Sequence, residues 1–422
     1  MKKYFPLFWV FYLLCAFSAH AGEGRYTIPL TGGGWSLWLD KEASWQNDRL
    51  YLPHEITDLS LLPVNVPTGG WQTLSHNPDA VPVEVPGTVE EYLTVTDNPR
   101  PENFRGVSWW YRKITIPADQ QKKRFIIYFE SVRMRAEVYL DGKLVAYDLI
   151  GETPFHVDIT DEAKPGKEQL LAIRVTNPGG NFHWQDFDIM KWGEYNIPPS
   201  RSFTGIIGRV KLESVNPVFI SDIYMQNTPE LTKVNAILSF TNETSSSVKQ
   251  DVELIVNEKG NPDKVVFRQT LKAISFPAGN HEVTIPVNVP DAKLWDLSTP
   301  ELYTCNVLIK KGKKTLDQDK KDFGFRWFTV DGVGKDAVLR LNGRRIMLRS
   351  AISWGYFPVT GLIATTEMAE KQVRTAKSLG LNMLNFHRCI GSPVVLEKAD
   401  ELGLLYYEEP GSFHSANHDP FI

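Results

Sequence analysis

The chain has 422 residues, a formal net charge of −4 and three cysteines. That length suggests two to four domains, because a domain usually has about 100–200 residues. An apolar share of 42% and a charged share of 23% are typical of a globular protein and exclude a disordered one. The acidic balance excludes a general electrostatic attraction to nucleic acid or to anionic lipid.

The first 21 residues have the pattern of an export signal. Residues 2 and 3 are lysines, residues 4–17 are almost wholly apolar, and Ala19-His20-Ala21 fits the small-x-small cleavage pattern. The apolar stretch is shorter than the ~20 residues that a membrane span needs. We therefore expect an exported protein, periplasmic or extracellular, that begins at Gly22 and has no membrane span.

The cysteines bear on the same question. A lipid anchor on Cys15 is the alternative to cleavage, but the two leucines before it are too large for a good lipoprotein site. Cleavage would remove Cys15 and leave Cys305 and Cys389, 84 residues apart and in different predicted domains. We expect neither a disulfide nor a metal site from them.

Residues 22–220 have the pattern of antiparallel strands. Residues 136–140 and 143–147 flank Asp141-Gly142, a dipeptide that supplies the positive φ angles of a two-residue hairpin. Residues 170–175 form another buried-strand run. Because no convincing amphipathic helix interrupts this stretch, the expected fold is a jelly-roll sandwich.

Residues 221–329 form a second predicted all-strand unit. In one of its runs, Val252, Leu254 and Val256 alternate with less apolar residues and give a single apolar face. The spacing of the runs suggests an immunoglobulin-like sandwich without the Cys–Trp–Cys framework. The five predicted strands are 233–240, 250–256, 265–271, 282–287 and 303–310.

Residues 330–422 alternate between predicted strands and helices. The strands are residues 345–349, 381–386 and 404–409. This spacing predicts parallel strands joined by helices. Because a complete (β/α)8 TIM barrel needs about 250 residues, we expect an incomplete barrel of about three strands.

The two helices between these strands have clear end signals. Thr365 or Thr366 can cap the first helix, and Gly380 follows its end. Ser392-Pro393 starts the second with proline at the first position, and Gly403 ends it. The expected apolar stripe of the first helix is Ala369, Val373, Ala376 and Leu379.

A series of motifs occurs in chain order: Trp109–Lys113 with Val138–Gly142, Phe203–Gly208, Leu294-Trp295 with Pro300–Tyr303 and Phe323–Arg326, Leu341–Gly343, Asn385–Arg388, and Ala399–Gly403 with Glu409–Gly411. Together these motifs resemble glycoside hydrolase family 2, the family of β-galactosidases, β-glucuronidases and β-mannosidases. The resemblance covers nearly the whole chain after the leader. It implies a jelly-roll sugar-binding domain, an immunoglobulin-like domain and a TIM-barrel catalytic domain.

The resemblance implies hydrolysis of terminal β-glycosidic bonds of oligo- or polysaccharides with retention, which needs two carboxylates about 5–5.5 Å apart. In the family both glutamates lie on later barrel strands, with the acid/base in an Asn-Glu pair. The only such pairs here, Asn242-Glu243 and Asn257-Glu258, fall in the second sandwich. Adjacent Glu408 and Glu409 point to opposite faces of a strand. We expect a chain that ends before both catalytic glutamates and is inactive alone.

The resemblance also indicates substrate-binding residues. Arg388 matches the family's arginine near the active site, where it orients carboxylates or sugar hydroxyls; a structural ion pair is the alternative. His387 lies opposite Arg388 by strand alternation, and its role stays open. Asp186 matches an aspartate that some galactosidases send into the active site, or is a solvated loop residue. Trp354 can stack on a sugar ring or pack in the core.

Two departures from the family pattern bear on specificity. Family members carry a histidine after the first barrel strand, where this chain has Trp354. Their second histidine, after the arginine, is replaced by Gly391. The sugar is therefore open, and the absence of a Glu-x-His motif after Glu409 means that no metal or cofactor is implied.

Two function classes compete. The first is an exported family 2 glycosidase of which this chain is a fragment, able to form a homo-oligomer. The second is a non-catalytic secreted carbohydrate-binding protein. A three-stranded partial barrel leaves unpaired strand edges, which favours the first class.

Overall fold

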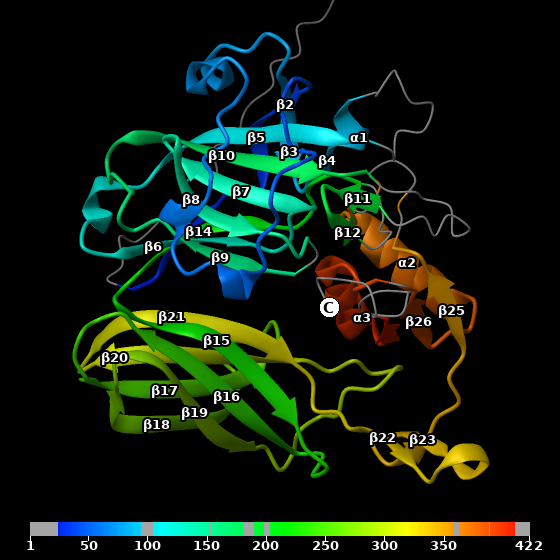
Figure 1. Ribbon diagram of the computed structural model, residues 1–422. Helices are drawn as coiled ribbons and strands as arrows, with labels where there is room; N and C mark the ends of the chain where they lie inside the picture. The colour runs from blue at the N-terminus through cyan, green and yellow to red at the C-terminus, as the bar shows by residue number, and fades with distance from the viewer. Residues whose placement is uncertain are drawn as a thin grey trace, which may run out of the picture.

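The computed structural model shows a mainly β protein of two sandwiches followed by a small α/β unit (Figure 1). The predicted leader, Asp186 and Arg388 lie outside the described residues. Among the described helices, none combines the length and apolarity needed to cross a bilayer. The structure describes residues 24–93, 104–151, 153–179, 190–197, 203–355, 357, 361, 363–387 and 389–409.

The first sandwich pairs a four-stranded with a six-stranded sheet. The first sheet has the order β1 (Tyr26–Pro29), β14 (Val210–Val215), β6 (Arg124–Phe129), β9 (Phe155–Asp158). The second has the order β3 (Val81–Val85), β2 (Gly32–Asp40), β5 (Gly106–Thr115), β10 (Glu168–Asn177), β7 (Arg135–Leu140), β8 (Lys143–Asp148). Two short pairs flank them: β4 (Gly87–Thr88) with β13 (Gly205–Ile206), and β11 (Met190–Trp192) with β12 (Tyr195–Ile197).

The predicted hairpin in this sandwich is confirmed. Strands β7 and β8 pair around Asp141 and Gly142, whose φ angles are +48° and +84°. Both angles lie in the left-handed region that such a turn requires.

Every side chain of β7 is buried, because the six-stranded sheet is covered on both faces. The four-stranded sheet covers one face. Residues 41–80 cover the other, where Trp45, Leu50 and Leu74 pack against Trp109 and Tyr139. The described helices of this sandwich are short: α1 (Val89–Tyr92) and the 3₁₀ turns η1 (Pro53–Glu55), η2 (Leu59–Leu61), η3 (Trp71–Ser75) and η5 (Ala118–Gln120).

The second sandwich contains all five predicted strands. One sheet has the order β15 (Val218–Asn227), β16 (Lys233–Asn242), β19 (Gly279–Asn288). The other has the order β18 (Val265–Phe276), β17 (Val248–Glu258), β20 (Tyr303–Lys311), β21 (Lys314–Phe323). Val252, Leu254 and Val256 are fully buried between the sheets, as their alternation predicts. The predicted border after residue 220 falls within β15.

The α/β unit begins with a small antiparallel sheet of β22 (Phe328–Asp331), β23 (Val338–Leu341) and β24 (Arg344–Arg345), with the 3₁₀ turn η6 (Gly334–Asp336) before β23. A parallel sheet of β25 (Ser350–Ser353), β26 (Met383–Phe386) and β27 (Leu405–Glu408) follows. Helices α2 (Thr366–Ser378) and α3 (Pro393–Leu402) connect these strands. This alternation is consistent with the start of a TIM barrel.

Both helices begin and end as predicted. The Thr365 side chain accepts a hydrogen bond from the Met368 amide, and Gly403 closes α3 in a left-handed conformation. Of the predicted stripe, Ala369, Val373 and Ala376 are buried, whereas Leu379 is exposed because α2 ends before it.

The prediction of a first parallel strand at residues 345–349 is wrong. Asn342 and Gly343, with φ angles of +52° and +77°, turn the chain back so that Arg344 and Arg345 pair with β23. Parallel pairing starts only at Ser350, opposite Met383. The apolar run at 346–348, with Arg349, therefore carries the chain between two sheets.

Candidate functional site

The carboxyl ends of the three parallel strands bring together residues that are far apart in the sequence. Ser353, Phe386 and Glu408 lie side by side in the register of β25, β26 and β27. The next residues along each strand, Trp354, His387 and Glu409, therefore meet at one edge. We call this set of three side chains the rim.

Direct contacts join the rim side chains. His387 Nδ1 lies 2.9 Å from Glu409 Oε2, and Asn385 Nδ2 donates to Glu409 Oε1 at 3.1 Å. The Trp354 ring meets the His387 ring edge to face, with centroids 4.7 Å apart at 88°. Trp354 is 40% exposed, so part of its indole faces solvent. Glu409 thus fixes the imidazole, and the indole gives the rim an aromatic surface.

The two adjacent glutamates are bound in different places. Glu408 Oε1 accepts a hydrogen bond from the Gly391 amide at 3.1 Å, at the start of α3. Glu409 instead contacts Asn385 and His387. This divergence follows from the alternation of side chains along a strand.

Gly391 occupies a position where a side chain has no room. A Cβ atom there would lie 2.8 Å from the Phe386 ring and 3.0 Å from Leu396 Cδ2. The glycine lets the first turn of α3 approach β26 closely. A larger side chain, such as the histidine that the resemblance implies here, would require Phe386 and Leu396 to move.

The sequence identified part of this arrangement. Trp354 and His387, both predicted to bind substrate, come together, while Asp186 and Arg388 lie outside the described residues. Sequence reasoning missed Asn385 and Glu409 as the groups that hold His387. The alternation of side chains along β26 could have indicated the role of Asn385. Leu384 and Phe386 are buried on the helix side, which leaves Asn385 on the other face.

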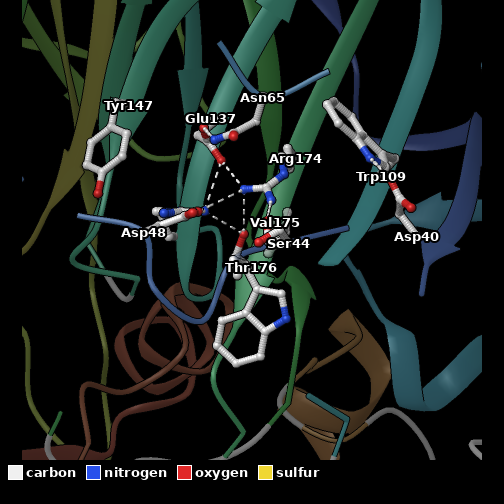
Figure 2. Close-up of polar contacts among 12 residues, drawn as sticks. Asp40, Ser44, Asp48, Asn65, Trp109, Glu137, Tyr147, Arg174, Val175 and Thr176 are labelled. Atoms are coloured by element: carbon white, nitrogen blue, oxygen red, sulfur yellow. Dashed lines mark hydrogen bonds and ion pairs between the residues drawn. The ribbon is translucent and has the colours of Figure 1, made fainter. Parts of the chain in front are cut away.

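A second polar cluster, buried in the first sandwich, was not predicted (Figure 2). Arg174 Nη1 lies 2.6 Å from Glu137 Oε2, and Arg135 Nη2 lies 3.3 Å from the same oxygen. Asp48 bonds Arg135 at 2.6 Å, and Asn65 Nδ2 donates to Glu137 Oε1 at 2.5 Å. Burial alone would raise the pKa of Glu137, but the two guanidinium groups outweigh it and hold that pKa below its usual value.

This cluster is enclosed, since Arg135, Glu137 and Arg174 are each only 2% exposed. It ties β7 and β10 to the covering segment through Asp48 and Asn65. The cluster therefore holds elements of the first sandwich together and does not form a sugar-binding surface.

The described part of the chain contains no cluster of three His, Cys, Asp or Glu side chains able to hold a metal ion. The side chains of Cys305 and Cys389 are both buried. Burial raises the pKa of Cys305 to about 12, so this thiol is unreactive at neutral pH.

Comparison with protein families finds two matches in chain order. Residues 33–196 match the model "Glycosyl hydrolases family 2, sugar binding domain". Residues 218–326 match the model "Glycosyl hydrolases family 2". Together they cover most of both sandwiches.

Among curated proteins, a β-glucuronidase from Formosa agariphila is 24% identical over 319 residues, 72% of this chain and 32% of that protein. A β-galactosidase from Thermoanaerobacterium thermosulfurigenes is 28% identical over 315 residues, 72% of this chain and 41% of that protein. A solved β-glucuronidase from Bacteroides uniformis has a TM-score of 0.69 at 21% identity and covers 94% of this chain. The chain spans less than half the length of each of these proteins.

Proposed function

The chain belongs to glycoside hydrolase family 2, and from that premise we propose that it is part of an exported, retaining β-glycosidase. The enzyme would remove terminal β-linked sugars from oligo- or polysaccharides. One observation carries the proposal: the two family domains are followed by a parallel unit whose strand ends hold Trp354, His387 and Glu409. In barrel enzymes, active sites lie at these strand ends.

The rim suits the binding of a sugar. The exposed part of Trp354 offers an apolar face on which the C–H surface of a pyranose ring can stack. The carboxylate of Glu409 orients His387, as a carboxylate partner orients imidazoles elsewhere. Arg388, next along the chain, would add a charge-assisted donor to a sugar hydroxyl or carboxylate. Asp186 is the proposed contribution of the first sandwich.

The proposal assigns the hydrolytic carboxylates to residues outside Met1–Ile422. Retention needs a nucleophile and an acid/base about 5–5.5 Å apart. Glu408 is engaged by the Gly391 amide, and Glu409 by Asn385 and His387. Neither glutamate is placed to act on the same anomeric carbon as the other. Later barrel strands, which carry both glutamates in the family, would supply them.

Experiment must decide which terminal sugar the enzyme removes. The relatives include both β-glucuronidases and β-galactosidases. Trp354 and Gly391 stand where the family carries sugar-contacting histidines, so the rim differs from both groups. A panel of nitrophenyl β-glucuronide, β-galactoside and β-mannoside tests this directly. The protein assayed is a longer one that includes a complete barrel. Cleavage of one substrate by this protein supports the proposal, and cleavage of none contradicts it.

Export is proposed from the leader pattern. Residues 2 and 3, the apolar stretch 4–17 and Ala19-His20-Ala21 together support cleavage before Gly22. A polysaccharide substrate is consistent with that location, because such polymers are degraded outside the cytoplasm.

A further inference from the structure

One face of helix α3 is acidic and meets both sandwiches. Glu397, Asp400 and Glu401 are three and four positions apart, so they share one side of the helix. Each of them pairs with a cation from another domain. The cations are Arg209 of the first sandwich, Lys259 of the second, and Arg326 just after the second.

Arg209 is shared between two carboxylates of unequal burial. Its Nη2 atom lies 2.7 Å from Glu130 Oε1 in its own domain and 2.7 Å from Glu397 Oε1 on α3. The side chain of Glu130 is 10% exposed, whereas that of Glu397 is 53% exposed. Glu130 therefore holds the guanidinium in place, and Glu397 is the partner that solvent and salt can reach.

Lys259 repeats this arrangement from the second sandwich. Its Nζ atom lies 3.0 Å from Asp322 in its own domain and 2.9 Å from Glu401 on α3. The contact is also partly exposed, so both Glu397 and Glu401 depend on screened electrostatics.

The carboxyl end of α3 is fastened by polar contacts with three side chains, Trp295, Arg326 and Lys377. Fully buried Trp295 donates its indole N–H to the Asp400 carbonyl at 2.7 Å. Arg326 stacks on the Trp295 ring and bonds Asp400 Oδ1 at 2.6 Å. Lys377 Nζ donates to the carbonyls of Leu297, at 2.6 Å, and Gly403, at 3.0 Å. This end is a fixed point.

The remaining part of the interface is open. A cavity of about 840 Å³ lies where the three units meet, lined by Tyr128 and Arg209 of the first sandwich, Lys320 of the second, and Leu396 and Tyr406 of the α/β unit. Packed apolar contact does not close this region. Around the cavity, the first sandwich is joined to α3 by the Arg209–Glu397 pair.

The amino end of α3 connects directly to the rim. Gly391, just before the helix, donates its amide to Glu408 at the end of β27. The same glycine packs against Phe386, which precedes His387. A shift of the first turn of α3 therefore moves the strand ends that carry His387 and Glu409.

We propose that Glu397, in the middle of α3, is a positioning residue: through Arg209 it holds the helix, and with it the rim, in register with the sugar-binding domain. Trp295 and Arg326 fasten the carboxyl end of the helix, and a salt-sensitive contact at mid-helix ties it to the first sandwich. This inference rests on the proposed function and names the contact that positions the rim. Its test uses no substrate, so it can fail independently of the proposed function.

Cys389 provides a native reporter of this contact. It is 2% exposed and lies between the rim and α3, while Cys305 is fully buried in the second sandwich and serves as reference. Labelling by a thiol reagent, quantified for each cysteine by peptide mass spectrometry, measures how often each site opens. The protein used is the 422-residue chain.

We expect Glu397→Gln to raise the labelling rate of Cys389 about two- to fivefold at low salt, the range for a partly exposed ion pair. In the wild type, 1 M NaCl should give a similar rise, because it shortens the screening length to about 3 Å. In the variant, salt should add little, because the other salt-sensitive pair, Lys259–Glu401, lies at the carboxyl end of α3, which Trp295 also fastens. Hydrogen–deuterium exchange of the Gly391 amide, measured by mass spectrometry, should also be faster in Glu397→Gln and in the wild type at 1 M NaCl.

The matched control is Glu370→Gln, which breaks the pair with Arg374 within α2 at the same 2.7 Å distance. It should leave the Cys389 rate unchanged. Wild-type labelling of Cys389 in Glu397→Gln would refute the proposal. A parallel rise at Cys305 would also refute it, since it would indicate a general loss of stability.

Discussion

Removal of the charge of Glu137 should strongly destabilise the first sandwich. Glu137→Gln keeps the shape of the side chain but leaves Arg135 and Arg174 buried with only Asp48 as a counter-charge (Figure 2). Asp48 is itself partly exposed. The variant therefore creates an uncompensated buried charge.

The size of the effect follows from that burial. Breaking a buried ion pair by removing one partner costs about 3–5 kcal/mol. With a slope of about 2–3 kcal/mol per M urea, the unfolding midpoint should fall by about 1–2.5 M. Tryptophan fluorescence is a suitable probe, because eight of the twelve tryptophans lie in residues 22–220.

The effect should also depend on pH. The pKa of Glu137 is lowered in the folded state. A carboxyl of this kind adds stability above its unfolded pKa of about 4.3, and this stability is lost as pH falls through the folded value. The difference between wild type and variant should be complete at pH 7 and shrink below about pH 4. A midpoint shift under about 0.5 M at pH 7, or no larger than that of exposed Glu370→Gln, would refute the reasoning.

Three further outcomes are expected. Gly391→Ala should cost about 1–3 kcal/mol in thermal unfolding, because its Cβ meets Phe386, whereas Gly33→Ala, with open space around it, should be neutral; equal effects would contradict the steric argument. In a protein with the complete barrel, Arg388→Ala should lower kcat/KM more than tenfold, a loss of at least ~1.4 kcal/mol, and an unchanged kcat/KM would exclude the assigned role. Amino-terminal sequencing of the exported protein should begin at Gly22, and an acylated Cys15 would overturn that assignment.

Local chemistry made much of the fold predictable. The Asp141-Gly142 turn, the Thr365 cap and the Gly403 end each depend on the conformation of a few neighbouring residues. The apolar alternation of β17 depends only on which face is buried. Such signals are contained in short stretches of sequence.

Other features depend on contacts that no short stretch contains. Strand β21 was missed because it is largely polar and charged, and it pairs at the edge of its sheet. Arg135 and Glu137 resemble surface charges until residues 41–80 are placed over them. Arg209 and Glu397 are 188 residues apart and meet only through the docking of α3.

The sequence predicted the candidate site only where it predicted the ends of the parallel strands. Trp354 and His387 follow two predicted parallel segments, so their meeting follows from strand order. The displaced first strand did not prevent this, because the residue after β25 is still Trp354. The bond from His387 to Glu409 required the register between β26 and β27.

Hydrolysis of nitrophenyl β-glycosides shows directly whether the catalytic carboxylates lie outside Met1–Ile422. The assay compares the 422-residue chain with a longer protein that includes a complete barrel. Both are purified free of host glycosidases. We expect no turnover by the 422-residue chain, and cleavage of at least one substrate by the longer protein with retained configuration at the anomeric carbon. Turnover by the 422-residue chain that Glu408→Gln or Glu409→Gln abolishes would contradict this expectation.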